Sequence, residues 1–173
     1  VTVTPSVSLS TLTAGLNSGI LQSGTSDQAV LGFGISMLGS NTVNQVTVAI
    51  STSTVGKISN PRLYLSVDNS YNGVGSETLV SATPTIDNTA GTITFGSLSQ
   101  AFASATKYYF LVVDVVTTVN AFDNPNLSFS LDQDDISYAM AINKIAYSDT
   151  KVYAFEDIIN PTVSSLVESP SII

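Results

Sequence analysis

Apolar and polar residues alternate along most of the chain. The alternation is clearest in residues 31–37, 46–50 and 63–67, where Val, Ile, Leu, Phe and Met take every second position. A period of two is that of a β-strand with one face on the core and the other in water. Further strands are predicted near 7–11, 78–82, 92–95, 127–131, 144–148 and 151–155. The pattern therefore predicts a fold built almost wholly of strands.

One run, 108–113, is apolar at every position, which predicts a central strand with both faces buried. Turn-forming pairs separate the predicted strands, as Asn-Pro does at 60–61 and Asn-Gly at 72–73. Only residues 98–105 and 134–143 have a composition that would hold a turn or two of helix. We predict an all-β fold, namely an antiparallel two-sheet sandwich of about ten strands with an immunoglobulin-like Greek-key topology.

The length of 173 residues suits one domain. We assign residues 1–159 to a single β-sandwich domain, and residues 160–173 to a terminal strand or a linker to a neighbouring module or subunit. The chain begins at Val1 with neither an initiating Met nor a signal peptide, so we interpret it as a mature product or an excised piece. Both ends of the chain are rich in β-branched residues and contain Pro. Two interpretations fit: a terminal strand with a linker, or end segments that pair with a neighbouring copy.

Charge and composition narrow the classes of function. Only 10% of the residues are charged, the formal net charge is −8, and Cys, His and Trp are absent. This excludes disulfides, Cys/His zinc sites, thiol nucleophiles and a histidine general base. Five basic residues are too few for nucleic-acid binding, and the longest apolar run is too short for a membrane helix. A Ser/Thr-rich, Lys-poor, Cys-free composition is common in bacterial extracellular proteins, so we expect an extracellular or cell-surface location.

The strongest candidate site is the segment 68–77. Oxygen-bearing side chains recur at alternate positions, Asp68, Ser70 and Asn72, and they are followed by a sharp-turn Gly73 and then Glu77. Calcium takes six to eight oxygen ligands, and such a loop supplies several of them. The alternative is an Asn-Gly turn in a solvated loop. No cofactor is required, and calcium is the one that these residues suggest.

A second acidic group consists of Asp123, Asp132, Asp134 and Asp135. These residues form another cation site if Asp123 and the 132–135 loop lie at the same end of the sandwich. The alternative is a solvated loop after a strand. A further carboxylate, Asp114, follows the apolar run. We expect it to have a partner, because an uncompensated buried carboxylate is costly. The candidates are Lys107, Lys144, a sheet end or an ion.

Two tyrosines are candidates for a ligand surface. Tyr64 lies on the face opposite Leu63 and Leu65, and Tyr71 lies in the 68–77 loop. Tyr beside Asn, Asp and a bound ion would form a sugar-binding platform, and the alternative is ordinary aromatic side chains at a sheet edge. Glycoside hydrolysis needs two carboxylates facing a cleft. Nothing in the sequence arranges such a pair, so we predict that the protein is not an enzyme.

Three segments together resemble a known family. These are residues 21–33, residues 60–65 leading into the 68–77 loop, and residues 108–115. They are similar to the repeated immunoglobulin-like modules of large secreted or surface proteins, adhesins included, of Bacteroidetes-like bacteria. The resemblance implies a sandwich module used for reach, display or adhesion.

The functional hypothesis is a non-enzymatic extracellular structural or adhesive module, a repeat or subunit of a bacterial surface fibre or adhesin. Its expected partners are neighbouring copies or modules, reached through the terminal strands, and surface glycans. The alternative is a carbohydrate-binding accessory module that uses loop Asp and Tyr residues with the help of calcium.

Overall fold

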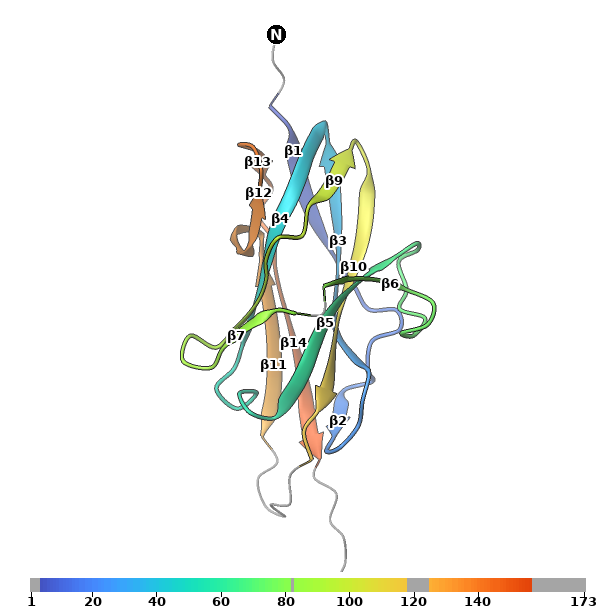
Figure 1. Cartoon of the computed structure of the whole chain (residues 1–173), viewed down its shortest axis with the longest axis vertical. Coiled ribbons are helices and arrows are strands. Elements are labelled where there is room, and N and C mark those ends of the chain that lie inside the picture. Colours follow the sequence, from blue (N-terminus) through green and yellow to red (C-terminus); the bar gives the residue numbers. More distant parts are fainter. Residues whose placement is uncertain (1–3, 82, 118–124, 157–173) are drawn as a thin grey trace, which may run out of the picture.

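The alternating segments form the strands of two facing sheets (Figure 1). The structure is a computed structural model that describes residues 4–81, 83–117 and 125–156. The strands are β1 (Ser6–Leu12), β2 (Ile20–Gln22), β3 (Gln28–Leu38), β4 (Ser40–Ile50), β5 (Ile58–Ser66), β6 (Thr78–Ser81), β7 (Thr85–Asp87), β8 (Thr92–Phe95), β9 (Gln100–Ala103), β10 (Thr106–Val115), β11 (Asn126–Asp132), β12 (Ile136–Tyr138), β13 (Asn143–Lys144) and β14 (Ser148–Glu156). The first sheet has the order β13-β1-β3-β10-β5-β6. The second has the order β2-β14-β11-β4-β8-β7, with β9 and β12 also paired to β4.

The seven longest strands have the immunoglobulin arrangement. They are β1, β3, β4, β5, β10, β11 and β14, each at least seven residues long. Lettered A to G in chain order, they give A-B-E-D in the first sheet and G-F-C in the second. These are the two sheets of a constant-type immunoglobulin domain. The predicted all-β sandwich with immunoglobulin-like topology is confirmed.

Strand number and direction differ from the prediction. The described residues contain fourteen strands instead of about ten. The added strands are two to four residues long, too short for an alternating pattern to reveal. Two of the pairs, β1 with β13 and β2 with β14, are parallel, so the sheets are mixed and not wholly antiparallel. Both pairs join a strand to a segment that has crossed from the other sheet, where no tight hairpin imposes an antiparallel direction.

The two weak helix predictions have different outcomes. Residues 98–105 contain β9, which pairs with β4. Of residues 134–143, only the first two belong to a helix, the one-turn 3-10 helix η1 (Gln133–Asp135). It is the one helical segment in the described residues. None of the helical structure described is long and apolar enough to cross a membrane.

The core lies between the sheets and is rich in aromatic residues. Its largest fully buried side chains include Phe33, Phe95, Tyr109 and Phe129. Full burial of each of these phenylalanines stabilises the fold by about 1.5–3 kcal/mol relative to exposure. The predicted central strand, β10, lies between β3 and β5, as expected from its apolar faces.

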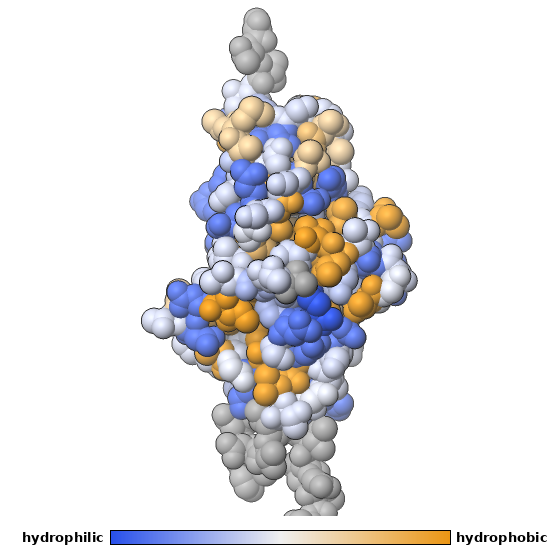
Figure 2. Space-filling model, viewed as in Figure 1, coloured by the Kyte–Doolittle hydropathy of each residue, from blue (hydrophilic) through white to orange (hydrophobic). Residues whose placement is uncertain are grey.

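The two ends of the described sandwich lie at opposite ends of its long axis (Figure 1). β1 runs downward from the upper end in that view, and β14 runs downward to the lower end. The face drawn in Figure 2 carries moderately apolar side chains near the upper end. The predicted boundary at residue 159 and the segment 160–173 lie outside the described residues.

Candidate functional site

The four residues predicted to bind calcium lie in one hydrogen-bonded loop after β5. The Asp68 carboxylate Oδ1 accepts the Ser70 backbone N–H at 2.9 Å and the Ser66 hydroxyl at 3.2 Å. Glu77 Oε1 accepts the Asn72 backbone N–H at 3.0 Å. The Asn72 side-chain amide nitrogen is 3.4 Å from Asp68 Oδ1. The loop therefore brings these four residues together, as the alternating pattern suggested.

The chemistry of this loop offers calcium few ligands. Asp68 Oδ1 and Glu77 Oε1 already accept hydrogen bonds from the loop, and Asn72 directs an amide nitrogen toward Asp68. Glu77 Oε2 is the carboxylate oxygen of the loop that is buried without a partner among the described residues. Among the described residues, no three Asp, Glu, His or Cys side chains form a group that could hold a metal ion. A calcium ion bound here would take most of its six to eight oxygens from backbone carbonyls and water. Calcium binding stays a prediction for this loop.

The two tyrosines predicted to bind a ligand pack on each other where the 68–77 loop meets the sheet. The ring of Tyr71 lies 6.2 Å from that of Tyr64 and 5.7 Å from that of Phe110, between centroids. Tyr64 is only 3% exposed. The Tyr71 hydroxyl is buried without a hydrogen-bond partner among the described residues, and burial raises the pKa of Tyr71 to about 12. Tyr64 is therefore not open to a ligand in this structure, because Tyr71 of the 68–77 loop and Leu16 from a distant part of the chain pack over this face of the sheet.

A second segment, residues 13–17, holds the 68–77 loop against the sheet. The Tyr71 backbone N–H donates to the Ala14 carbonyl at 3.0 Å, and Ala14 bridges to Ser70. Gly15 lies beside this contact with a φ of +80°, and a Cβ there would be 2.1 Å from the Tyr71 carbonyl oxygen. Only glycine fits this position. The two segments close a small apolar cluster on the outside of the first sheet.

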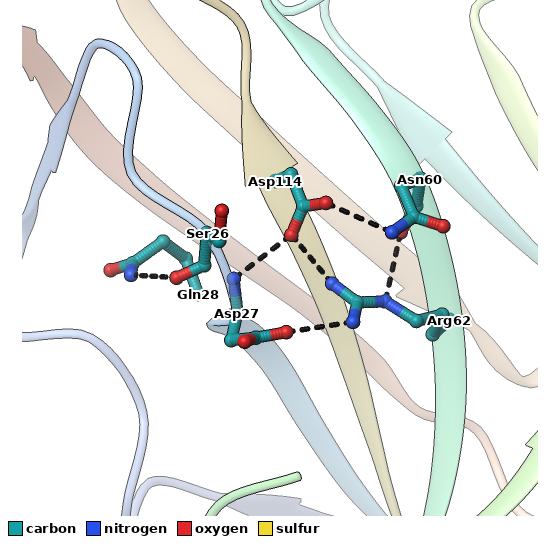
Figure 3. A network of polar contacts seen from close by, with 6 residues as sticks. All are labelled: Ser26, Asp27, Gln28, Asn60, Arg62 and Asp114. Carbon is teal, nitrogen blue, oxygen red and sulfur yellow. Dashed lines mark hydrogen bonds and ion pairs between the residues drawn. The ribbon is translucent and has the colours of Figure 1, made fainter.

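Another feature of the first sheet is a network of charged groups centred on Arg62 of β5 (Figure 3). Arg62 Nη1 is 2.7 Å from Asp27 Oδ1, and Nη2 is 2.6 Å from Asp114 Oδ1. Asp114 also accepts the Asn60 side-chain amide and the Asp27 backbone N–H, both at 2.9 Å. The Arg62 side chain is 13% exposed, that of Asp114 23% and that of Asp27 50%. The network ties the β2–β3 loop to β5 and β10.

The partner of Asp114 is thus neither Lys107 nor Lys144. Lys107 lies over the Phe102 ring, and Lys144 pairs with Asp134. Burial alone would raise the pKa of Asp114, but the Asp27 N–H, the Asn60 amide and the Arg62 guanidinium together hold it below its usual value. Sequence reasoning missed this role of Arg62 because it depends on the register that places β5 beside β10.

In the second acidic group, the described residues are engaged in a hydrogen bond and an ion pair within the protein. Asp135 Oδ2 accepts the Asp132 backbone N–H at 2.7 Å and so closes the η1 turn. Burial, with the charges of Asp132 and Asp134, raises the pKa of Asp135 against that hydrogen bond. Asp134 is an exposed partner of Lys144 at 3.1 Å. Asp123 lies outside the described residues, so its expected meeting with the 132–135 loop stays a prediction.

Three surface hollows show no acid pair. A hollow of about 310 Å³ where the paired ends of β1 and β3 meet the start of β10 is lined largely by Ser, Thr and aliphatic side chains. One of about 460 Å³ contains Asp134 as its single carboxylate, and one of about 280 Å³ beside β2 contains none. Glycoside hydrolysis needs two facing carboxyl groups. None of these three hollows has them.

Comparisons with known proteins add little. No protein-family model matches the sequence. No curated protein matches it either. One similar solved structure is self-complemented MyfA, the major subunit of Myf fimbriae from Yersinia enterocolitica, with 12% identity, 88% of this chain and 99% of that chain covered, and a TM-score of 0.39.

Another is a family 123 glycoside hydrolase from Clostridium perfringens that acts on glycolipid glycans. The identity is 12%, the TM-score is 0.36, and the match covers 90% of this chain. This chain spans only 27% of that hydrolase. Scores this low carry no argument about function.

Proposed function

We propose that this chain is a non-enzymatic structural module of a fibre or adhesin on a bacterial surface, joined end to end with neighbouring copies or modules. One observation carries the proposal: the two ends of the described sandwich lie at opposite ends of its long axis, and the long strands run along that axis (Figure 1). Units joined head to tail through such ends form an extended array instead of a closed ring.

The β14 edge of the second sheet has features that oppose the pairing of a further strand from the side. β2 covers only residues 154–156 of β14, and no other described strand pairs with that edge at residues 148–153. Along this stretch Asp149 and Lys151 are mostly buried and form an ion pair of 3.0 Å. Inward-pointing charges on an edge strand oppose the addition of a further strand, because pairing would desolvate them. Such an edge favours association through the ends over association through the sides.

The upper end of the molecule presents apolar side chains that suit a neighbour. Leu38, Met140 and Ile145 are each more than half exposed. Leu38 ends β3, Met140 is tied to Asn41 at the start of β4, and the Ile145 N–H donates to Val7 of β1. These contacts place all three near the end from which the chain enters the sandwich. Exposed apolar side chains that gather in one region favour an interface with another protein.

Electron microscopy of the native material tests the proposal. We expect filaments or surface arrays that contain this chain in longitudinal repeat. Substitution of Leu38, Met140 and Ile145 by Lys is expected to abolish end-to-end association while leaving the melting temperature of the single unit unchanged. A matched control places Lys at Thr89, an exposed position in the β7–β8 turn. A native chain that is monomeric and absent from every surface structure would overturn the proposal.

A carbohydrate-binding role has weaker support. It would use Tyr64 and Tyr71 together with the Asp residues of the loops, but the Tyr71 ring packs on the rings of Tyr64 and Phe110. A glycan array is the direct test of this alternative. Binding that is lost on Tyr71→Ala would favour it over the structural role.

A further inference from the structure

Two short parallel strand pairs connect the beginning of the chain to its end. Strand β13 lies beside β1, with Ser6 opposite Asn143 and Val7 opposite Lys144. Strand β2 lies beside β14, with residues 20–22 opposite residues 154–156. In each pair, one strand comes from the first fifth of the described chain and the other from its last fifth.

The two pairs are reciprocal crossings between the sheets. β2 follows β1 in the chain, yet it lies in the other sheet, against β14. β13 precedes β14, yet it lies in the first sheet, against β1. The pair containing β2 lies at the lower end of Figure 1, and the pair containing β13 lies toward the upper end. Each terminal strand is therefore hydrogen-bonded to a segment from the opposite end of the sequence.

The directions of β1 and β14 determine how the sandwich responds to a pull between its two ends. A pull between the two ends draws β1 upward and β14 downward, each along its own length (Figure 1). The hydrogen bonds of a sheet run across its strands, so such a pull shears several bonds at once and does not open them one after another. On this path β1 is also held by its antiparallel ladder with β3. Because β2 is continuous with β1 through residues 13–19, the force that passes beyond β1 drives β2 and β14 in opposite directions past each other.

The β2–β14 pair is the better built of the two. The Ala154 N–H donates to the Gly19 carbonyl at 2.9 Å, and the Ser23 N–H donates to the Glu156 carbonyl at 2.8 Å. Leu21 and Phe155 bury their side chains fully beneath the pair, and the Lys57 ammonium lies 5.0 Å from the centre of the Phe155 ring. The β1–β13 pair also has two hydrogen bonds, to the carbonyls of Pro5 at 2.9 Å and Val7 at 3.1 Å, but of its paired side chains only Val7 is buried, since residues 143 and 144 of β13 are exposed.

We infer that the β2–β14 pair is a mechanical clamp, the element that resists unfolding when the module is pulled between its ends. The inference rests on the proposed structural role, since only a module in an extended array is pulled in this direction. The upper pair, β1–β13, shares the load but has less buried support. A partner joined at either end thus transmits force through both sheets.

Single-molecule force measurement on the isolated chain, held by its two ends, tests the clamp. Ala154→Pro removes the N–H that bonds to Gly19. We expect its unfolding rate at a fixed force to rise about tenfold, the factor for one backbone hydrogen bond that breaks at the rate-limiting step. Val152→Pro is the matched control. Its N–H points to the same edge two residues earlier, beyond the end of β2, and its side chain is also exposed.

A second measurement leaves the β2–β14 pair unaltered and changes the direction of pulling. Because the chain has no cysteine, single cysteines at Thr89 and Gly75 provide unique attachment points in the β7–β8 turn and the β5–β6 loop. Those two segments lie on opposite flanks in Figure 1. A pull across the flanks peels strands one by one, so we expect it to unfold the chain at a lower force than a pull between the ends.

The outcomes separate the clamp from the functional proposal. Equal unfolding rates for Ala154→Pro and Val152→Pro, or equal forces in the two pulling directions, would refute the clamp. A chain that builds filaments but shows either result keeps the structural role and loses the clamp. If the clamp is measured but the chain never occurs in an array, the clamp is kept and the structural role is lost.

Discussion

Two polar clusters lie on the outer side of the first sheet, and they compensate their carboxylates in different ways. Asp114 faces the Arg62 guanidinium at 2.6 Å and is mostly buried. Asp68 and Glu77 lie in a loop and accept hydrogen bonds from nearby backbone N–H groups. The first cluster joins three separate segments of the chain, whereas the second closes a single loop. We therefore expect the Arg62 network to matter for the stability of the whole fold and the loop to matter only locally.

Removal of the guanidinium should have the largest effect. Arg62→Met keeps the length of the side chain but leaves Asp27 and Asp114 close together without a cation. We expect a loss of about 2 kcal/mol in the free energy of unfolding, between the values for exposed and buried ion pairs. Urea denaturation measures it. Lys144→Met is the control, because its partner Asp134 is 93% exposed, and it should cost less than about 0.5 kcal/mol. Equal losses in the two variants would contradict this ranking.

The pH dependence of stability should reveal the same difference. The pKa of Asp114 is lower in the folded chain than its usual value, so ionised Asp114 stabilises the fold above the unfolded-state pKa of about 3.9. That contribution is lost as the pH falls from there through the folded-state pKa. Melting temperatures between about pH 5 and pH 2 should therefore fall more steeply for the native chain than for Asp114→Asn. Parallel curves would show that Asp114 contributes nothing to the acid transition.

The contrast between the clusters also shows what a sequence can predict. Phe33 and Leu111 could be assigned to the core, because the alternation around Phe33 and the continuous apolar run around Leu111 are local properties of one strand and burial follows them. The meeting of Arg62 with Asp114 could not, because it depends on the register of β5 against β10, which lie far apart in the chain. The 68–77 loop could be predicted in part. Its internal hydrogen bonds follow from its own spacing, but its packing over Tyr64 needs the distant residues 13–17.

Truncation within the loop should cost less than the loss of Arg62. Glu77→Ala removes the acceptor of the Asn72 N–H, and that group is exposed enough for water to replace the carboxylate. We expect a loss of about 0.5–1 kcal/mol by urea denaturation, the net value of one hydrogen bond. Glu77→Gln, which keeps an acceptor oxygen, should retain most of the stability. A loss as large as that of Arg62→Met would mean that the loop supports the sheet beneath it.

Calcium should have the smallest effect of all. With only two carboxylates, Asp68 and Glu77, the loop falls in the weak class of calcium sites, with a Kd of about 10⁻³ M. At about 1 mM calcium such a site is half occupied, which stabilises the fold by about 0.4 kcal/mol and raises the melting temperature by about 2 °C at most. Thermal unfolding with calcium and with EDTA measures the shift, and Glu77→Ala should abolish it. A rise of about 5 °C or more would mean that the loop rearranges to give the ion further oxygen ligands, and the two clusters would then differ less than their geometry indicates.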